Sequence, residues 1–314
     1  MNKPKVYIDG REGTTGLQIE ERLRHRTDLE LLTIDESKRK DPEERKKLLN
    51  AADAAFLCLP DQAAREAVAL VENPDTRIID ASTAHRVAPG WDYGFPELSS
   101  AHRAAVAASR RVANPGCHAT GFISIVYPLV SLGLLPRDAA LTCFSLTGYS
   151  GGGKKMIAQY EGPDKGPELF SPSVYALAQG HKHLPEMRQV CGLEAPPVFC
   201  PIVDDYYKGM ATTVPLHMAQ LRGVSTLRQV RQALADHYAG ARLVRVAEDS
   251  DGTAALYANA RAGRDDLSLI VAGNDRQLTI TALFDNLGKG ASGAAVENLN
   301  IMLGLEETTG LNLE

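Results

Sequence analysis

Three features that would assign this chain to whole classes of protein are missing from its sequence. No apolar run approaches the roughly 18 residues that a membrane-spanning helix requires. The short apolar stretch behind Lys3 and Lys5 stops at Asp9, too early for a secretory signal peptide. The formal net charge is -5, which gives no broad basic field for nucleic acid. We therefore expect partners that are neither membrane nor nucleic acid.

Cysteine is also scarce and irregularly placed. Five cysteines form an odd set with no CxxC pair and no repeated spacing, which argues against a disulfide framework and favours a reducing, cytoplasmic setting. Hydrophobic residues make up 44% of the chain and charged residues 23%, as in ordinary soluble globular proteins. A length of 314 residues fits one large domain or two of common size.

What the sequence does contain is an alternation of strand and helix patterns. Strand patterns fall at 5–9, 29–34, 54–59 and 77–80, separated by helical patterns at 17–26, 42–51 and 62–71. This order favours a parallel sheet covered on both faces. Later strand patterns at 140–146, 198–203, 209–215, 267–272 and 277–283 indicate a mixed or antiparallel sheet. We predict an α/β fold, with a doubly wound Rossmann-like domain followed by an α+β domain.

A glycine turn joins the first strand to the first helix. Gly10, Gly13 and Gly16 follow the strand directly, and a helical pattern begins after them. Small residues there let the backbone approach a pyrophosphate at a helix N-terminus, which favours dinucleotide binding. The GxxGxxG spacing departs from the commoner GxGxxG, and a purely structural tight turn is the alternative.

The end of the second strand bears on the choice of dinucleotide. Asp35 and Glu36 would suit a ribose 2′-hydroxyl, whereas Ser37, Arg39 and Lys40 would suit a 2′-phosphate. We favour the phosphate, and hence NADP, because cations cluster where it would lie. A solvated loop whose charges balance one another is the alternative.

Cys117 is the candidate nucleophile. It follows the turn Asn114-Pro115-Gly116 and precedes a helical apolar pattern at 119–135, in which Pro128 should introduce a kink. At a helix start the unpaired N–H groups and the helix dipole favour a thiolate and can hold an oxyanion. A small buried hydrophobe is the alternative reading of such a cysteine.

A titrating partner for the thiol is present in the stretch that holds His181 and His183. Histidine titrates near neutrality and suits a general acid and base. His118 is a rival, but adjacent side chains on a helix point apart. Zinc would need a third ligand, and no Cys or His stands at a supporting spacing. We therefore expect no metal.

A glycine-rich segment, GYSGGGKK at 148–155, ends in two lysines. Its backbone N–H groups and ammonium charges can clasp an anion, although it lacks the spacing of a P-loop. The alternative is a flexible surface loop. We select Ser150 and Lys154 as candidate phosphate-binding residues.

Several motifs together resemble N-acetyl-gamma-glutamyl-phosphate reductase in its short form, over essentially the whole chain. They are DGREGTTG at 9–16, DASTAHR at 80–86, PGWDYGFPEL at 89–98, NPGC at 114–117, GYSGGGK at 148–154, HKHLPEM at 181–187 and DNLGKGASG at 285–293. His118 departs from the pattern, because an aromatic residue is more usual after the thiol. Aspartate-semialdehyde dehydrogenases are more distant relatives that share the thiol chemistry, and such an activity is the alternative enzyme. A catalytically silent nucleotide-binding regulator is the alternative outside enzymes.

The resemblance implies NADPH-dependent reduction of N-acetyl-L-glutamyl 5-phosphate to N-acetyl-L-glutamate 5-semialdehyde and phosphate, through a cysteine thioester, in arginine biosynthesis. It places the nucleophile at Cys117 and the acid/base histidine in the HKH motif, where we choose His181 and keep His183 as a second candidate. The predicted substrate-binding residues are Arg86, Asn114, Ser150 and Lys154. The predicted cofactor-binding residues are Gly10, Gly13, Thr14, Thr15, Gly16, Ser37, Arg39, Lys40, Pro60 and Ser82.

The expected architecture has two domains. We predict that residues 1–115 bind NADP and are completed by a C-terminal helix within 290–314, where Ala295, Leu299, Met302 and Leu303 form an apolar stripe. Residues 116–289 would hold the catalytic groups and the subunit contacts. The family suggests a homodimer or a homotetramer.

Overall fold

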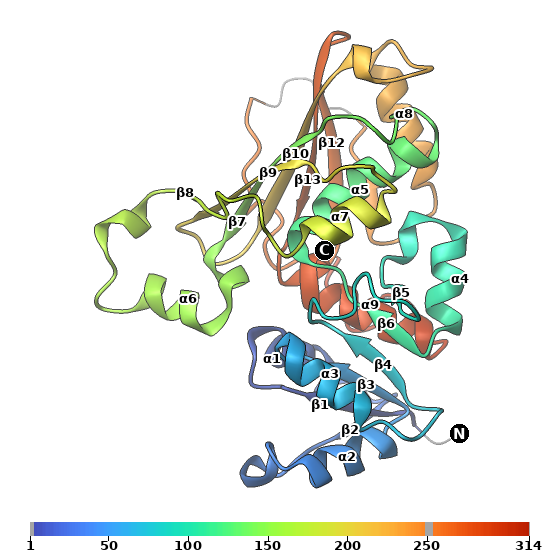
Figure 1. Cartoon of the computed structure of the whole chain (residues 1–314), viewed down its shortest axis with the longest axis vertical. Helices are drawn as coiled ribbons and strands as arrows, with labels where there is room; N and C mark the ends of the chain where they lie inside the picture. Colours follow the sequence, from blue (N-terminus) through green and yellow to red (C-terminus); the bar gives the residue numbers. More distant parts are fainter. Residues whose placement is uncertain (1–2, 249–253, 314) are drawn as a thin grey trace. The chain divides into compact units, whose positions relative to one another are not determined.

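The computed structural model describes residues 3–248 and 254–313 of the chain. It divides into two compact units (Figure 1). The first unit runs to Pro115 and also includes Ala291–Leu311. The second unit comprises Gly116–Gly290 and the residues from Asn312 on.

The first unit is built on a six-stranded parallel sheet in the order β2-β1-β3-β4-β6-β5. Its strands are β1 (Lys5–Asp9), β2 (Glu30–Leu32), β3 (Ala54–Leu57), β4 (Arg77–Asp80), β5 (Asp92–Tyr93) and β6 (Arg111–Ala113). The order reverses between β1 and β3, since the chain moves outward from β1 to β2 and then returns to the other side of β1. In open parallel sheets, ligands bind at the carboxyl ends of the strands at such a switch point.

Helices cover both faces of this sheet. They are α1 (Thr14–Leu23), α2 (Pro42–Ala51), α3 (Asp61–Ala69), α4 (Ser100–Ala108) and α9 (Gly293–Met302). Val6 and Ile8 of β1 join α1, α4 and α9 in one buried cluster, whereas Tyr7 joins residues of α2 and α3 in another. Successive strand residues point to opposite faces, so the two clusters lie on opposite sides. The predicted doubly wound domain is confirmed.

The second unit holds a seven-stranded mixed sheet in the order β11-β12-β13-β10-β7-β9-β8. Its strands are β7 (Thr142–Gly148), β8 (Ser173–Val174), β9 (Val198–Asp204), β10 (Met210–His217), β11 (Val244–Val246), β12 (Leu267–Gly273) and β13 (Gln277–Phe284). The pairs β7/β9 and β11/β12 are parallel, and the other neighbours are antiparallel. The predicted mixed sheet is confirmed.

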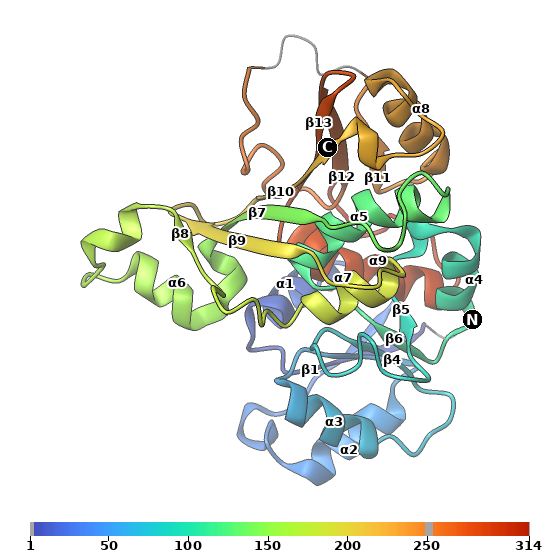
Figure 2. The same cartoon turned by 45° about the horizontal axis from the view of Figure 1, so that its top comes forward.

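One face of the mixed sheet is covered by helices, and the other carries exposed apolar side chains. The helices of this unit are α5 (Cys117–Ser131), α6 (Gly153–Glu161), α7 (Leu184–Val190) and α8 (Leu227–His237) (Figure 2). Helix α5 approaches β10 closely, because a Cβ at Gly121 would lie 2.4 Å from Thr212 Oγ1. On β7 and β9, Phe144 is 42% exposed and Val198 57% exposed. Helix α5 continues three residues beyond Pro128.

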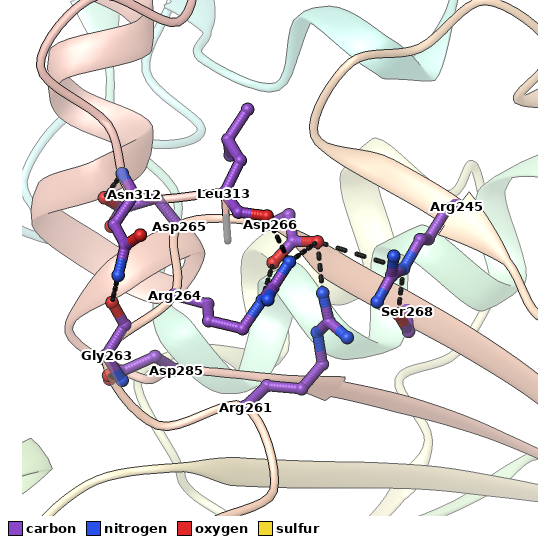
Figure 3. Close-up of polar contacts among 10 residues, drawn as sticks. All are labelled: Arg245, Arg261, Gly263, Arg264, Asp265, Asp266, Ser268, Asp285, Asn312 and Leu313. Atoms are coloured by element: carbon purple, nitrogen blue, oxygen red, sulfur yellow. Dashed lines mark hydrogen bonds and ion pairs between the residues drawn. The ribbon is translucent and has the colours of Figure 1, made fainter.

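The last described residues depart from the predicted domain limits, because they lie with the second unit. The backbone N–H of Asp265 donates to the Asn312 carbonyl at 2.7 Å, and Asn312 N donates back to Asp265 Oδ2 at 2.8 Å. Arg264 also donates to the Leu313 carbonyl (Figure 3). These bonds fix the end of the chain beside β12. No helix within residues 3–248 and 254–313 is long and apolar enough to span a bilayer.

Candidate active site

The glycine turn after β1 is too tight to accept side chains at two of its positions. Gly10 has φ +81, and a Cβ there would lie 2.5 Å from the Cys58 carbonyl oxygen. A Cβ at Gly16 would lie 2.6 Å from the Gly10 carbonyl oxygen. Gly13 N donates to the same carbonyl at 3.1 Å, which closes the turn. The turn thus requires glycine at Gly10 and Gly16.

The start of α1 has unused hydrogen-bonding capacity at this turn. Its N-cap, Gly13, supplies no side-chain cap, so the first N–H groups of the helix are not met by a side chain. The Thr14 hydroxyl is buried and has no hydrogen-bond partner among the described residues. Buried polar groups are normally bonded, so an orphaned hydroxyl beside uncapped N–H groups indicates a site for an anion. The residues present fit a dinucleotide pyrophosphate.

The other predicted cofactor residues of the sheet follow neighbouring strands at the same edge. Pro60 is the N-cap of α3 after β3, and Ser82 follows β4. Ser82 is buried, and its hydroxyl donates to Asp80 Oδ2 at 2.7 Å. Because carboxyl ends of parallel strands meet at one edge, the fold brings these residues to the edge that holds the glycine turn.

The segment predicted to bind a 2′-phosphate is occupied by its own acidic residues. Ser37 donates from its backbone N–H and its hydroxyl to Asp35 Oδ1, at 2.8 and 2.6 Å. Arg39 forms ion pairs with Glu12 and, at 2.7 Å, with Glu36. Lys40 is exposed. In this structure the charges of the segment balance one another, so a phosphate would have to compete with Glu12 and Glu36.

A buried aspartate organises the loop that carries Arg86. Asp80 is fully buried and accepts hydrogen bonds from Ser82, while His85 Nδ1 lies 2.6 Å from its Oδ2. The His85 ring stacks on Trp91, with centroids 4.1 Å apart. The Arg86 guanidinium donates to the Asn114 carbonyl at 3.0 Å and the Ala81 carbonyl at 3.2 Å. The loop is thereby held by side chains within the first unit.

The Asn114 side chain forms hydrogen bonds within the first unit. It is 1% exposed, and its amide donates to the Ala291 carbonyl at 2.9 Å. Its side-chain oxygen accepts from Asn298 Nδ2 at 3.2 Å. These bonds link the chain before Cys117 to the segment that enters α9.

Cys117 is the first residue of α5 and is half-buried. The N-cap, Gly116, gives no side-chain cap, and its N–H donates to Glu186 Oε2 on α7 at 3.1 Å. Gly290 packs against the cysteine, because a Cβ there would lie 3.0 Å from Cys117 Cβ. Cys117 is therefore the first residue of a 15-residue helix that has no side-chain N-cap, and Gly290 packs beside it. This is a position that favours a thiolate.

Three histidine rings gather in the second unit, and two of them, His118 and His181, contact the Phe199 ring. The centroids of His181 and His183 are 4.7 Å apart, and each lies within 5.7 Å of the His118 centroid. His181 is half-buried and His183 is buried, and His183 N donates to His181 Nδ1 at 3.1 Å. Among the described residues, no group of His, Cys, Asp and Glu is arranged to hold a metal ion.

His118 has both ring nitrogens in hydrogen bonds away from the solvent. Its Nδ1 lies 2.7 Å from Ser145 Oγ and its Nε2 lies 2.7 Å from Tyr175 Oη. Burial, and after it the charges of His181 and Lys182, lowers the pKa of His118 to about 3. The imidazole is therefore neutral at physiological pH, which disfavours it as a general acid near neutrality.

The glycine-rich segment after β7 splits into a buried and an exposed part. Ser150 is 1% exposed, and its hydroxyl accepts from Asn286 Nδ2 at 3.0 Å. Lys154 is exposed in the first turn of α6. An ammonium group at that end of a helix adds to the positive end of the dipole, which favours anion binding.

Several groups of these networks had no assigned role in the sequence. Glu186 lies inside the HKHLPEM motif, but the motif does not indicate its role. The structure shows that its carboxylate accepts a hydrogen bond from the Gly116 N–H. Asp80 and His85 likewise lie in a quoted motif without an assigned role. Tyr175 and Ser145 gave no sequence signal, because neither has a local pattern and their bonds to His118 span 57 and 27 residues.

Two family models match the chain, one on each unit. Residues 5–106 match the NAD-binding domain of semialdehyde dehydrogenase, and residues 117–286 match its dimerisation domain. The fold resembles aspartate semialdehyde dehydrogenase II complexed with ASA from Vibrio cholerae, with TM-score 0.74, 14% identity and 97% of this chain and 99% of that chain covered. It also resembles the Candida albicans enzyme with NADP, with TM-score 0.68, 14% identity and coverage of 96% and 99%. The class is therefore that of the semialdehyde dehydrogenases.

Full-length relatives narrow this class. N-acetyl-gamma-glutamyl-phosphate reductase 2 from Nostoc sp. is 49% identical, over 99% of this chain and all of the relative. The reductase 2 from Pseudomonas putida is 48% identical over 99% of this chain and all of the relative, and the Burkholderia cenocepacia reductase is 48% identical over 97% and 98%. The chain belongs to the N-acetyl-gamma-glutamyl-phosphate reductase family, which consists of oxidoreductases.

Proposed function

We propose that the protein reduces N-acetyl-L-glutamyl 5-phosphate to N-acetyl-L-glutamate 5-semialdehyde with NADPH, releasing phosphate, as a step of arginine biosynthesis. The main observation in support is a cysteine at the uncapped start of a buried helix, in a chain 49% identical over its length to a reductase of that name. A cytoplasmic location stays a prediction.

The proposed chemistry begins at Cys117. Its thiolate attacks the acyl carbon, the bond from that carbon to the phosphate oxygen breaks, and a thioester remains. When bound, NADPH supplies the hydride that reduces this thioester. The thiohemiacetal then collapses to the aldehyde as the carbon–sulfur bond breaks and the thiolate is restored. Two easier steps replace one difficult step.

The proposed proton transfers fall to His181. It donates a proton to the oxygen of the thiohemiacetal and takes it back on collapse. His181 is the more accessible ring of the pair, since His183 is buried at 4% exposure. General acid/base catalysis of this kind contributes about 10²- to 10⁴-fold. We therefore expect His181→Ala to slow turnover by that order without loss of cofactor binding.

For the cofactor we propose NADP(H), held at the glycine turn. Gly10, Gly13 and Gly16 with Thr14 and Thr15 would take the pyrophosphate at the N-terminus of α1. Pro60 and Ser82 would line the neighbouring strand ends. Ser37, Arg39 and Lys40 would take the 2′-phosphate, with the guanidinium of Arg39 exchanging Glu12 and Glu36 for the ligand.

For the substrate we propose that cationic and hydroxyl groups hold the acyl phosphate. Arg86 and Lys154 supply positive charge, and Ser150 supplies a hydroxyl. Asn114 contributes by fixing the turn before Cys117 through its bond to the Ala291 carbonyl. Orientation by such groups lowers the barrier because phosphate is already a good leaving group.

For assembly we propose a homodimer or homotetramer formed through the open face of the mixed sheet. The match of residues 117–286 to a dimerisation domain supports an oligomer. Phe144 and Val198 project from that face with 42% and 57% exposure. Exposed apolar surface of this kind marks interaction sites. Light scattering of Phe144→Asp against wild type tests this, with a smaller particle expected.

The decisive assay of the activity is the reverse reaction. N-acetylglutamate semialdehyde, phosphate and NADP are mixed with the protein, and nicotinamide absorbance is followed. Growth of NADPH absorbance that requires phosphate and disappears in Cys117→Ala supports the proposal. Turnover of aspartate semialdehyde in its place would assign the alternative substrate. No turnover of either, with an ordinary Cys117 alkylation profile, would favour a nucleotide-binding regulator.

A further inference from the structure

A buried amide joins the DNLGKGASG motif to the glycine-rich segment after β7. Asn286 is 2% exposed, and its Nδ2 donates to Ser150 Oγ at 3.0 Å. Its side-chain oxygen accepts from the backbone N–H of Gly209 at 2.9 Å. Ser150 itself is 1% exposed. All three residues belong to the second unit, and Asn286 is the link between the other two.

The orientation of the Asn286 amide is fixed by its bond with Gly209. A backbone N–H can only donate, so it requires the amide oxygen, and the NH₂ group must then face Ser150. The opposite orientation of the amide would set two N–H donors against each other at Gly209. An NH₂ group offers no acceptor, so the Ser150 oxygen accepts this bond. The hydroxyl hydrogen therefore has to be donated elsewhere.

The hydrogen of the Ser150 hydroxyl has no acceptor among the described residues. The bond from Asn286 is the one hydrogen bond that this hydroxyl forms with them. Thr147 on β7 shows the contrast, because its buried hydroxyl donates to the Gly148 carbonyl at 3.2 Å. Buried O–H groups normally find an acceptor. The acceptor for Ser150 is therefore expected on a bound ligand.

The surroundings of Ser150 favour an anionic acceptor. The backbone N–H of Gly153 donates to the Ser150 carbonyl, so the serine belongs to the turn that leads into α6. Gly152, the N-cap of α6, supplies no side-chain cap, and the first N–H groups of the helix are not met by a side chain. Lys154 adds an ammonium group in the first turn. Phosphoryl oxygens are acceptors that suit such a helix start.

We propose that Asn286 is a positioning residue that compels the Ser150 hydroxyl to donate, and that this hydroxyl donates to a phosphoryl oxygen of the bound ligand. The inference rests on the proposed function, in which that oxygen belongs to the acyl phosphate. The pyrophosphate of the dinucleotide has the same chemistry, and kinetics separate the two sources. Asn286 acts through Ser150 and exchanges no proton.

The first test compares KM for phosphate with KM for NADP in the reverse assay. Ser150→Ala should raise KM for phosphate about 10- to 100-fold, as loss of a hydrogen bond to a charged group does, and leave kcat within about threefold. A rise in KM for NADP in its place would assign the phosphoryl oxygen to the dinucleotide. Thr147→Val, which removes a buried hydroxyl whose hydrogen is used inside the protein, is the matched control. Unchanged constants in folded Ser150→Ala would overturn the proposal.

The second test reverses the bond with the nearly isosteric Asn286→Asp. The carboxylate still accepts from Gly209, but it also accepts from Ser150, so the hydroxyl hydrogen turns away from the ligand. KM for phosphate should rise at least as much as in Ser150→Ala. The new negative charge also repels phosphate, and the double variant Ser150→Ala/Asn286→Asp measures that contribution.

Asn286→Asp should therefore weaken phosphate binding less in the Ser150→Ala background than in the wild-type background. Asn286→Leu gives the same comparison without added charge, and its smaller effect should vanish once Ser150 is alanine. Equal effects in the two backgrounds would overturn the role of Asn286.

Calorimetric titration of inorganic phosphate, with NADP present, separates this inference from the proposed function. Weaker phosphate binding by Ser150→Ala than by wild type, in a protein that turns over neither semialdehyde, would sustain the inference and reject the function. Turnover by wild type, with phosphate and NADP bound equally tightly by both proteins, would do the reverse.

Discussion

The two units present their candidate functional groups in different ways. In the first unit, consecutive residues from Gly10 to Gly16 form a tight backbone turn whose shape depends on missing Cβ atoms. In the second unit, the hydrogen-bonded side chains around His118, which follows Cys117 in the sequence, come from separate elements, such as Ser145 on β7 and Thr212 on β10. A site formed by backbone can be recognised from a short stretch of sequence. A site formed by side chains from separate elements cannot be recognised in this way, because only folding brings those residues together.

The largest expected effect is on turnover, and it should occur without any effect on cofactor binding. Cys117→Ala should abolish turnover, by about 10⁴-fold or more, because the covalent step is lost. Binding of NADPH, followed by its fluorescence, should remain at wild-type strength if the cofactor site depends on the backbone of the first unit. Cys200→Ala, a half-buried cysteine on β9, is the control. An active Cys117→Ala protein would end the thioester scheme.

The next effect concerns side-chain charge in the second unit. Asp266 is buried and accepts hydrogen bonds from Arg264 and Arg261, while Arg245 lies 3.9 Å away (Figure 3). Asp266→Asn leaves these guanidinium groups without their carboxylate and should cost about 3 to 5 kcal/mol in the free energy of unfolding. Urea titration measures it. Asp75→Asn, which removes a surface pair with Arg110, should cost less than about 1 kcal/mol.

Comparison of wild type with Asp266→Asn also predicts how the free energy of unfolding depends on pH. Burial acts to raise the pKa of Asp266, but the hydrogen bonds from Arg264 and Arg261 outweigh it and lower the pKa. A carboxyl whose pKa is lowered by folding stabilises the protein above its unfolded pKa, and this stabilisation disappears as the pH falls through the folded pKa. As the pH falls through the folded-state pKa of Asp266, the wild-type protein should lose stability more steeply than Asp266→Asn. Parallel curves for the two proteins would contradict this.

A smaller effect tests the backbone site. Gly10→Ala forces a side chain into a backbone with φ +81 and sets its Cβ 2.5 Å from the Cys58 carbonyl. We expect a loss of about 1 to 3 kcal/mol in stability and loss of NADPH binding, measured by thermal melting and fluorescence titration. Gly90→Ala has φ +78 but nothing within 4 Å, so it isolates the backbone strain. Equal effects of the two substitutions would show that the close approach is irrelevant.

The smallest effect concerns cofactor choice. Arg39→Ala should weaken NADP binding by about tenfold, since one exposed guanidinium–phosphate contact is removed, and should leave NAD binding nearly unchanged. Arg24→Ala, at the C-cap of α1, is the matched control, because the Arg24 side chain is 65% exposed. Equal weakening of both dinucleotides would place the 2′-phosphate elsewhere.

Local patterns allowed part of this molecule to be predicted from its sequence. The strands at Lys5–Asp9 and Arg77–Asp80 were predicted to the residue, because a short, continuously buried run between helical patterns is a local signal. The strands β5 and β6 were missed, since two- and three-residue strands depend on their neighbours. The bonds of His118 were equally hidden, because tertiary contacts alone bring Tyr175 to it.

The placement of α9 bears on how the chain folds as it is synthesised. This helix closes the buried cluster around Val6 and Ile79 with Ala295, Leu299 and Met302. One side of the parallel sheet therefore lacks part of its cover until residues 293–302 have left the ribosome. The nascent N-terminal region must expose apolar surface during that interval, which makes it a natural client of chaperones.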